Sequence, residues 1–158
     1  MGEESSLVAP RFARGCRCFA VLMDGSVAGY GWLSTQPEWV GELQLEIRPR
    51  PGEGYIWNCT TVHSHRRRGI FRSLLAGVCA IALGEGLRRL WIGSVAIPAE
   101  KAVGPAGFKP ALHFSSFRFA GLHVLRMTAA EPAISDDGAS VLGARPGWYL
   151  RRSRTRVH

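Results

Sequence analysis

The chain has 158 residues, a length typical of one domain with a sizeable core. Hydrophobic residues make up 46% and charged residues 20% of the chain, which is the balance of a globular protein and excludes a disordered one. The net charge of +8 favours anionic ligands. No apolar run reaches the ~18 residues that a membrane span needs, so we expect no membrane partner.

The first predicted elements are a flexible N-terminus and a β-hairpin. Residues 1–15 are polar at their start and lack the apolar segment of a signal peptide, so we expect a flexible N-terminus and a cytoplasmic protein. Cys16–Met23 and Ser26–Ser34 have the β-branched and aromatic composition of strands, and Asp24-Gly25 between them is a strong hairpin signal. The alternation of Leu43–Ile47 predicts a further strand.

The central stretch predicts a strand, a basic turn and a helix. Tyr55–Val62 is aromatic and β-branched, as in a buried strand, and Ile70–Glu85 carries apolar residues at helical spacing. Gly86 is well placed as the C′ residue of that helix. Between strand and helix lie two histidines, three arginines and Gly69.

This turn is predicted to bind a phosphate or pyrophosphate. The free N–H groups of a first helical turn form an anion site, a glycine lets the backbone approach a ligand, and arginines add positive charge. The sequence contains neither GxxxxGK[ST] nor GxGxxG, which excludes a P-loop and argues against a dinucleotide-binding turn. A plain strand-turn-helix unit with a solvated basic turn is the alternative.

The C-terminal half continues with strands and a loop. Leu90–Ile97 predicts a buried strand parallel to the central one, since a right-handed helical crossover joins them. Leu112–Phe119 and Leu122–Met127 predict a closing hairpin. Residues 129–158 are interpreted as a loop and a mobile basic tail. The fold class is α/β (α+β).

The central motif resembles that of the GNAT acetyltransferase family, R/Q-x-x-G-x-G/A after a strand and at the start of a helix. Here it reads Arg66-Arg67-Arg68-Gly69-Ile70-Phe71, and Phe71 departs from the small residue of the pattern. Gly107-Phe108, 38 residues after Gly69, resembles the family's K-x-G-F pair. The order of elements is also similar. The resemblance implies a GNAT-like domain over residues 16–128, with a mixed, mostly antiparallel sheet around a β-α-β acetyl-CoA-binding core.

The resemblance implies an N-acetyltransferase that moves an acetyl group from acetyl-CoA to a primary amine. The strand near Cys59 would pair with the pantetheine arm, and the N–H groups of the turn would hold the pyrophosphate. The implied acetyl-CoA-binding residues are Cys59, Thr60, Thr61, Arg66, Arg67, Arg68, Gly69, Ile70 and Phe71.

The catalytic groups are less well matched to the family. The position of the usual carboxylate base, about eleven residues before Arg66, holds Tyr55, and a free tyrosine with a pKa near 10 is a poor base at neutral pH. Glu53 is a nearby carboxylate and the second candidate, although a solvated charge is its simpler interpretation. The position of the tyrosine that often protonates the CoA thiolate holds Val103. We expect no counterpart of the family's N-terminal strand and two helices in the fifteen residues before Cys16. Three explanations stay open: a truncated chain, a misplaced initiator, or a wall supplied by a partner chain, as in a homodimer.

Three functions therefore stay open. The first is the acetyltransferase, the second a weak or inactive GNAT-fold module that binds CoA and regulates a partner, and the third a basic nucleic-acid-binding protein. The third lacks interleaved aromatic and basic residues on an exposed strand and any helix-turn-helix pattern. The four cysteines lack metal-ligand spacing, so we expect no metal. The acceptor is not defined by the sequence and could be a small molecule or a peptide.

Overall fold

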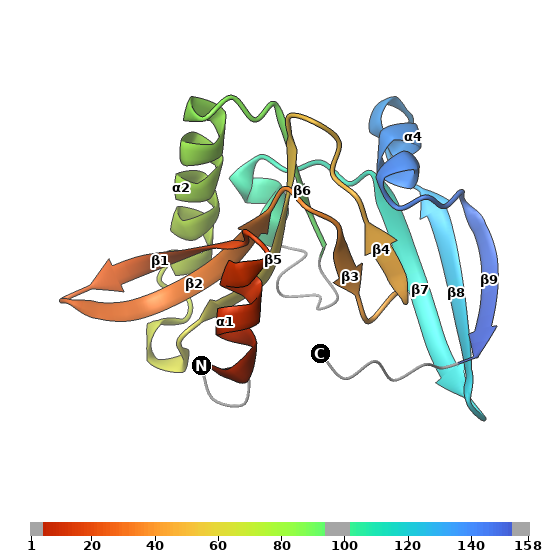
Figure 1. Ribbon diagram of the computed structural model, residues 1–158, viewed down its shortest axis with the longest axis horizontal. Coiled ribbons are helices and arrows are strands. Elements are labelled where there is room, and N and C mark those ends of the chain that lie inside the picture. Colours follow the sequence, from red (N-terminus) through yellow and green to blue (C-terminus); the bar gives the residue numbers. More distant parts are fainter. Residues whose placement is uncertain (1–4, 94–101, 153–158) are drawn as a thin grey trace. The chain divides into compact units, whose positions relative to one another are not determined.

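The computed structural model describes residues 5–93 and 102–152 (Figure 1). The chain divides into two compact units. Unit 1 comprises Met1–Gln36 and Pro49–Phe108, and unit 2 comprises Pro37–Arg48 and Lys109–His158. Each unit is described by itself below.

Unit 1 is built on a four-stranded sheet in the order β1-β2-β5-β6. Its elements are α1 (Ser5–Ala13), β1 (Arg17–Met23), β2 (Ser26–Ser34), β5 (Glu53–Thr61), α2 (Ile70–Gly84) and β6 (Arg89–Ile92), with short 3-10 turns at His63–His65 and Gly104–Ala106. All neighbouring strands are antiparallel except β5 and β6, which are parallel. The predicted hairpin turn is confirmed, since Asp24 and Gly25 have φ of 50° and 75°.

The core of unit 1 lies between the sheet and α2. The residues that form it share one helix face and one sheet face: Leu33, Ile56, Leu74, Leu75, Val78 and Ala82. Gly86 ends the helix as predicted, with φ of 88°. The N–H groups of Gly86 and Leu87 donate to the carbonyls of Leu83 and Ala82, which is a Schellman motif.

Unit 2 contains a three-stranded antiparallel sheet, a short hairpin and a helix. Its elements are β3 (Glu38–Val40), β4 (Leu45–Ile47), β7 (Leu112–Phe119), β8 (Leu122–Ala129), α4 (Pro132–Val141) and β9 (Gly147–Arg152). The strand order is β7-β8-β9, and β3 pairs with β4. The hairpin β7–β8 has the bounds expected from the sequence to within two residues.

Two sequence predictions about the ends of the chain were wrong. The N-terminus is not flexible throughout residues 1–15, because Ser5–Ala13 forms α1 and Arg11 is buried. Residues 129–158 are not only loop and tail, because they contain α4 and β9. Tertiary contacts hold both helices. The composition of α4 is typical of a loop, but Gly138 lets the Ala111 side chain approach this helix closely. Part of the predicted strand Leu90–Ile97, and the end of the tail, lie outside the described residues.

Candidate anion and acyl-donor site

The turn between β5 and α2 presents a row of backbone N–H groups. Arg67 and Gly69 have left-handed φ values of 62° and 76°, whereas Arg68 between them does not. Backbone that changes hand in this way directs successive N–H groups to one side, as in anion-binding nests. Gly69 is the N-cap of α2 and no side chain caps the helix. The first helical hydrogen bond runs from the Ser73 N–H to the Gly69 carbonyl, so the preceding N–H groups have no acceptor within the helix.

Four exposed arginines surround this helix N-terminus: Arg66, Arg67, Arg68 and Arg72. Within the part of the chain that the structure describes, their side chains have no ion-pair or hydrogen-bond partner. Positive charge is unfavourable at this end of a helix, because the helix dipole is itself positive there. The fold therefore does not explain these residues, whose charge is suited to an anionic ligand. Arg72 was not singled out from the sequence, although a basic residue in a first helical turn is a signal for such a site.

Phe71, the departure from the family motif, does not occupy the turn. Its side chain is partly buried and packs against the core of unit 1. Its backbone lies in the first turn of α2, among the N–H groups that lack a helical acceptor. Gly69 has open space around it, since a Cβ built there meets no atom within 4 Å. The glycine is thus required by its positive φ and not by close contacts with other protein atoms.

A second feature of the site is a bulge in β5. Tyr30 pairs with Thr60 and Trp32 with Trp57, so two residues of β5 lie opposite Gly31 alone. One of them, Asn58, has φ of 46°. Bulges often re-aim backbone groups beside active sites. This bulge was not predicted from the sequence. Asparagine was the available signal, because it is unusual in strands and tolerates a left-handed conformation.

The described pairing of the parallel strands β5 and β6 ends next to the bulge. Their register runs from Glu53 opposite Arg89 to Ile56 opposite Ile92 and then ends. Beyond Ile56, no described strand lies beside β5 on the β6 side. This edge of β5, which includes the predicted Cys59–Thr61 segment, offers backbone groups to an extended ligand. The edge leads directly into the basic turn.

Burial makes the Cys59 thiol unreactive. Its side chain packs against the core of unit 1 and donates to the Trp57 carbonyl at 3.8 Å. Burial raises the pKa of Cys59 from 9.0 to about 12. The thiolate is the nucleophilic form of cysteine, so at neutral pH Cys59 is not equipped to carry an acetyl group. Any contribution to the site then comes from its backbone.

The expected result of alkylation follows from this pKa. With the pKa raised to about 12, the thiolate fraction of native Cys59 at pH 7.5 is roughly a thousandfold below that of an ordinary thiol. Iodoacetamide labelling of Cys59, followed by peptide mass spectrometry, should be slow in buffer and fast in urea. The Cys59→Ala variant should keep acyl transfer within about threefold of wild type. Rapid native labelling, or loss of transfer with intact acetyl-CoA binding, would contradict a purely backbone role.

The two candidate bases lie in different surroundings. The Tyr55 hydroxyl lies 3.3 Å from the position that a Cβ on Gly93 would take, which places it just beyond the last β5–β6 pair. Glu53 is buried at the other end of β5, roughly 20 Å along the strand from Cys59. Its carboxylate accepts hydrogen bonds from Trp91 at 2.9 Å and from the Arg50 N–H at 3.2 Å. These contacts favour a structural role for Glu53 and leave Tyr55 as the candidate near the end of the described β5–β6 pairing.

The face of the sheet opposite α2 carries an aromatic cluster. The Arg11 guanidinium of α1 lies 4.5 Å from the Trp57 ring centroid and 5.1 Å from that of Trp32. Phe12 packs on Trp32 at 5.2 Å. Trp57 directly precedes the bulge, so α1 supplies a wall beside the end of the described β5–β6 pairing. This wall was not predicted from the sequence, because residues 1–15 were expected to be flexible.

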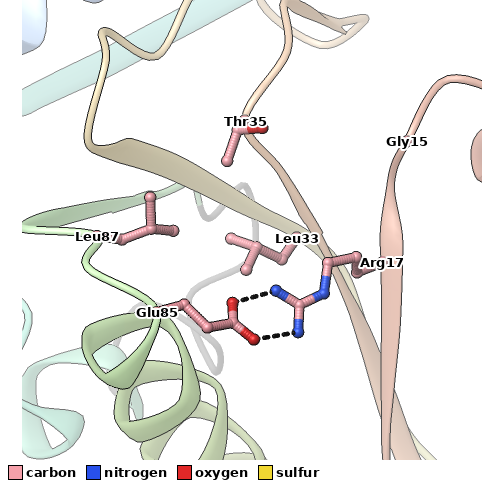
Figure 2. Close-up of a pocket in the computed structure, with 6 residues that line it drawn as sticks. All are labelled: Gly15, Arg17, Leu33, Thr35, Glu85 and Leu87. Atoms are coloured by element: carbon pink, nitrogen blue, oxygen red, sulfur yellow. Dashed lines mark hydrogen bonds and ion pairs between the residues drawn. The ribbon is translucent and has the colours of Figure 1, made fainter.

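A separate pocket lies at the other end of α2. It has a volume of about 190 Å³ and is lined by Gly15, Arg17, Leu33, Thr35, Glu85 and Leu87. Figure 2 shows the Arg17 guanidinium and the Glu85 carboxylate meeting through two contacts inside it. The hydrogen bond from Arg17 lowers the pKa of Glu85. Glu85 and Gly69 cap opposite ends of a 15-residue helix, about 22 Å apart, so this pocket is not part of the anion site.

Clusters of metal-ligating side chains and membrane-spanning helices are absent from residues 5–93 and 102–152. No group of three histidine, cysteine, aspartate or glutamate side chains is placed to hold a metal ion. None of the helices in 5–93 and 102–152 combines the length and the apolar character needed to cross a membrane.

The fold is similar to that of several acetyltransferases of known structure. An acetyltransferase from Agrobacterium tumefaciens is 17% identical, with a TM-score of 0.52 over 75% of this chain and 78% of the other. The aminoglycoside N-acetyltransferase AAC(6′)-Iy in complex with CoA is 18% identical, with a TM-score of 0.51 over 75% and 92% of the two chains. The same enzyme with a bisubstrate analogue gives a TM-score of 0.56 at 17% identity, over 75% and 82%. No curated protein matches the sequence.

These likenesses define the class of fold as that of the acetyltransferases. The sequence also matches the model of the acetyltransferase (GNAT) family over residues 3–104, about two thirds of the chain. The chain therefore belongs to the GNAT family. The predicted resemblance and the mixed, mostly antiparallel fold class are both confirmed. The family match includes α1, which the sequence analysis had left out of the domain.

Proposed function

We propose that this protein is an N-acetyltransferase that moves an acetyl group from acetyl-CoA to a primary amine. The observation that carries the proposal is the helix N-terminus after β5, where unengaged N–H groups meet four arginines that have no carboxylate partner among the described residues. The family match supports acyl-CoA as the donor. The strand edge beside this turn supports an extended donor and not an isolated phosphate.

The residues present fit acetyl-CoA in its main chemical parts. The turn at Arg67–Phe71 and the flanking arginines suit the pyrophosphate, since helix N-termini and arginines both favour phosphate oxygens. The edge of β5 at Cys59–Thr61 suits the amide groups of the pantetheine arm. The thioester would then lie toward the bulge at Asn58 and the aromatic wall of α1.

The chemistry at this place needs a proton acceptor. The ammonium group of the acceptor loses a proton, the amine nitrogen bonds to the thioester carbon, and the carbon–sulfur bond breaks to release the CoA thiolate. We assign this role to the Tyr55 hydroxyl, which lies beside Gly93 and would pass the amine proton to water. A backbone N–H of bulged β5 would stabilise the oxyanion. Val103 offers no proton, so the thiolate takes its proton from water.

Removal of the Tyr55 hydroxyl tests this assignment. Tyr55→Phe should lower kcat for acyl transfer about 100-fold, as loss of a general base does, and leave the Kd for acetyl-CoA within about twofold. Thiol release from acetyl-CoA measures transfer, and titration calorimetry measures the Kd. Tyr30→Phe on β2 is the matched control and should change neither. An unchanged kcat in Tyr55→Phe would remove Tyr55 from the mechanism.

The acceptor panel should be broad, because no side chain in the described residues selects one amine. It should contain aminoglycosides, since the structurally similar AAC(6′)-Iy is an aminoglycoside N-acetyltransferase, together with polyamines and peptides. Aminoglycosides enter the panel as one class among several, because a likeness at 18% identity carries the fold alone.

A second candidate function is a CoA-binding module without turnover. It is favoured by Tyr55 and Val103, which stand where the family commonly has a carboxylate base and a tyrosine acid. This function predicts saturable binding of acetyl-CoA with no thiol release for any amine of the panel. Acceptor-dependent thiol release at any rate above the background hydrolysis would exclude it.

A further inference from the structure

The β7-β8-β9 sheet of unit 2 presents two different faces (Figure 1). Side chains alternate along each strand, so the register assigns every residue to one face or the other. On one face, the β8 side chains are almost completely buried: His123, Leu125 and Met127. The other face, here called the exposed sheet face, includes Ser115, Phe117 and Phe119 of β7, Val124 and Arg126 of β8, and Trp148 of β9.

Three aromatic side chains project from the exposed sheet face into solvent. Phe117, Phe119 and Trp148 are 58%, 74% and 69% exposed. Phe117 and Phe119 are alternate residues of β7, so they lie roughly 7 Å apart along the strand, and Trp148 lies two strands away on β9. Aromatic side chains on an open sheet are the surface on which RNA-binding and single-strand-binding domains stack bases. The face therefore offers stacking positions for two or three bases.

A positive charge lies within the face, beside one of these rings. Arg126 is exposed, and the register places it between Ser115 on β7 and Trp148 on β9. Its guanidinium lies 5.3 Å from the Trp148 ring centroid. The three strands contain arginine but no aspartate or glutamate, so an anionic ligand would meet no like charge on them.

A single-stranded nucleic acid matches both features of the face. Its unpaired bases suit the three aromatic rings, and its phosphates suit the Arg126 guanidinium. An anionic membrane is the alternative partner of an aromatic and basic surface. Contact of the whole face with a bilayer would bury Arg126, which lies inside the face and not at its rim, and a charged side chain in hydrocarbon is unfavourable. The position of Arg126 therefore favours the nucleic acid.

We propose that the exposed sheet face binds single-stranded nucleic acid. Phe117, Phe119 and Trp148 stack on unpaired bases, and Arg126 contacts a phosphate beside Trp148. Ser115, on the other side of Arg126, supplies a hydroxyl for the sugar-phosphate backbone. This combination was not predicted from the sequence, because the register of three strands creates it. The proposal does not depend on acyl transfer, since the face belongs to unit 2 and the β5–α2 turn to unit 1.

Fluorescence anisotropy of labelled oligonucleotides mixed with the full chain tests the proposal. Single-stranded RNA and DNA of about 12 nucleotides should bind with a Kd of about 1–100 µM in about 100 mM salt. A duplex of the same sequence should bind at least about tenfold more weakly, because its bases are paired and cannot stack on the rings. Comparison of the RNA and DNA strands shows whether the 2′-hydroxyl group contributes.

Two variants separate base stacking from charge attraction. The double variant Phe117→Leu with Trp148→Leu keeps apolar bulk but removes two rings, and it should weaken single-strand binding about 30-fold. Arg126→Gln should weaken binding about fivefold and lower the slope of log K against log salt by about 0.7, the value for one phosphate contact. Arg118→Gln is the matched control, because Arg118 is an exposed arginine of β7 on the opposite face, and it should change neither quantity.

Folding of the variants is checked by circular dichroism and by acetyl-CoA affinity, which none of them should change. If the double variant fails to fold, Phe119→Leu at the end of the hairpin provides the same test with a milder change. Absence of binding to both single strands overturns the proposal, and so does unchanged binding in the leucine variants or an equal loss in Arg118→Gln and Arg126→Gln.

Two further outcomes would assign the binding elsewhere. Displacement of the oligonucleotide by saturating acetyl-CoA would place it at the β5–α2 turn, which overturns the proposal. Sedimentation of the wild-type chain with vesicles of phosphatidylserine and phosphatidylcholine, without oligonucleotide binding, would identify a membrane surface and also overturn it. The proposal expects the oligonucleotide to stay bound when acetyl-CoA saturates the turn.

Discussion

Gly69→Glu is expected to lower the affinity for acetyl-CoA more than 100-fold. The side chain would project from the N-terminus of α2, beside the N–H groups that we assign to the pyrophosphate, and it would bring a like charge to that place. The positive φ of 76° adds strain of about 1–2 kcal/mol. Calorimetric titration with acetyl-CoA measures the loss of affinity.

Gly86→Glu separates the loss of the site from the loss of stability. Gly86 follows the other end of α2, has φ of 88°, and likewise has no atom within 4 Å of a built Cβ. The two variants therefore share strain, bulk and charge change. Glutamate is also less favourable at a helix C-terminus, so the control should be the less stable of the two. If Gly86→Glu weakened binding as much as Gly69→Glu, the phosphate site would not be at the β5–α2 turn.

Replacing Arg66, Arg67 and Arg68 together by glutamine should change affinity and stability in opposite directions. Affinity for acetyl-CoA should fall about 100-fold, because hydrogen bonds to charged groups contribute about 1.5–3 kcal/mol each and exposure reduces this. The free energy of unfolding of the free protein should rise slightly, because positive charges next to a helix N-terminus are unfavourable by about 0.3–1 kcal/mol each. Urea unfolding and calorimetry measure the two quantities.

The matched control is the triple replacement of Arg48, Arg88 and Arg118 by glutamine. Each of these arginines is exposed and none is adjacent to the turn in sequence, yet the net charge falls by the same three units. The control should bind acetyl-CoA within about threefold of wild type. An equal loss of affinity in both triples would mean that net charge attracts the ligand and that the turn has no special role. A fall in stability on replacing the turn arginines would show that they have structural partners.

The central stretch was predictable because local rules govern it. The strand before the turn, the positive φ of Gly69, the helix and the Schellman cap at Gly86 each follow from residues adjacent in sequence. The departure from the family motif at Phe71 was visible in the sequence, but the position of its side chain was not. That its side chain joins the core depends on the packing of α2 against the sheet.

The missed features depend on contacts between distant residues. Arg11 is buried because its guanidinium stacks on Trp32 and Trp57, and no pattern within Ser5–Ala13 indicates that contact. Helix α4 contains proline, glycine, serine and aspartate, which are typical of loops, and tertiary packing overrides their propensity. The bulge at Asn58 appears only from the register of β5 against β2. Of the two predicted catalytic residues, Tyr55 lies near the end of the described β5–β6 pairing, whereas Glu53 accepts hydrogen bonds at the other end of β5, and both roles stay predictions.

Calorimetric titration of the full chain with acetyl-CoA, with CoA as the comparison, is the most direct measurement of the central claim. The account predicts saturable binding of both ligands with one site per chain and a Kd in the micromolar range, or about −8 kcal/mol. It also predicts that Gly69→Glu removes this binding and Gly86→Glu does not. A folded wild-type sample that binds neither ligand would contradict the assignment of the β5–α2 turn as the acyl-donor site.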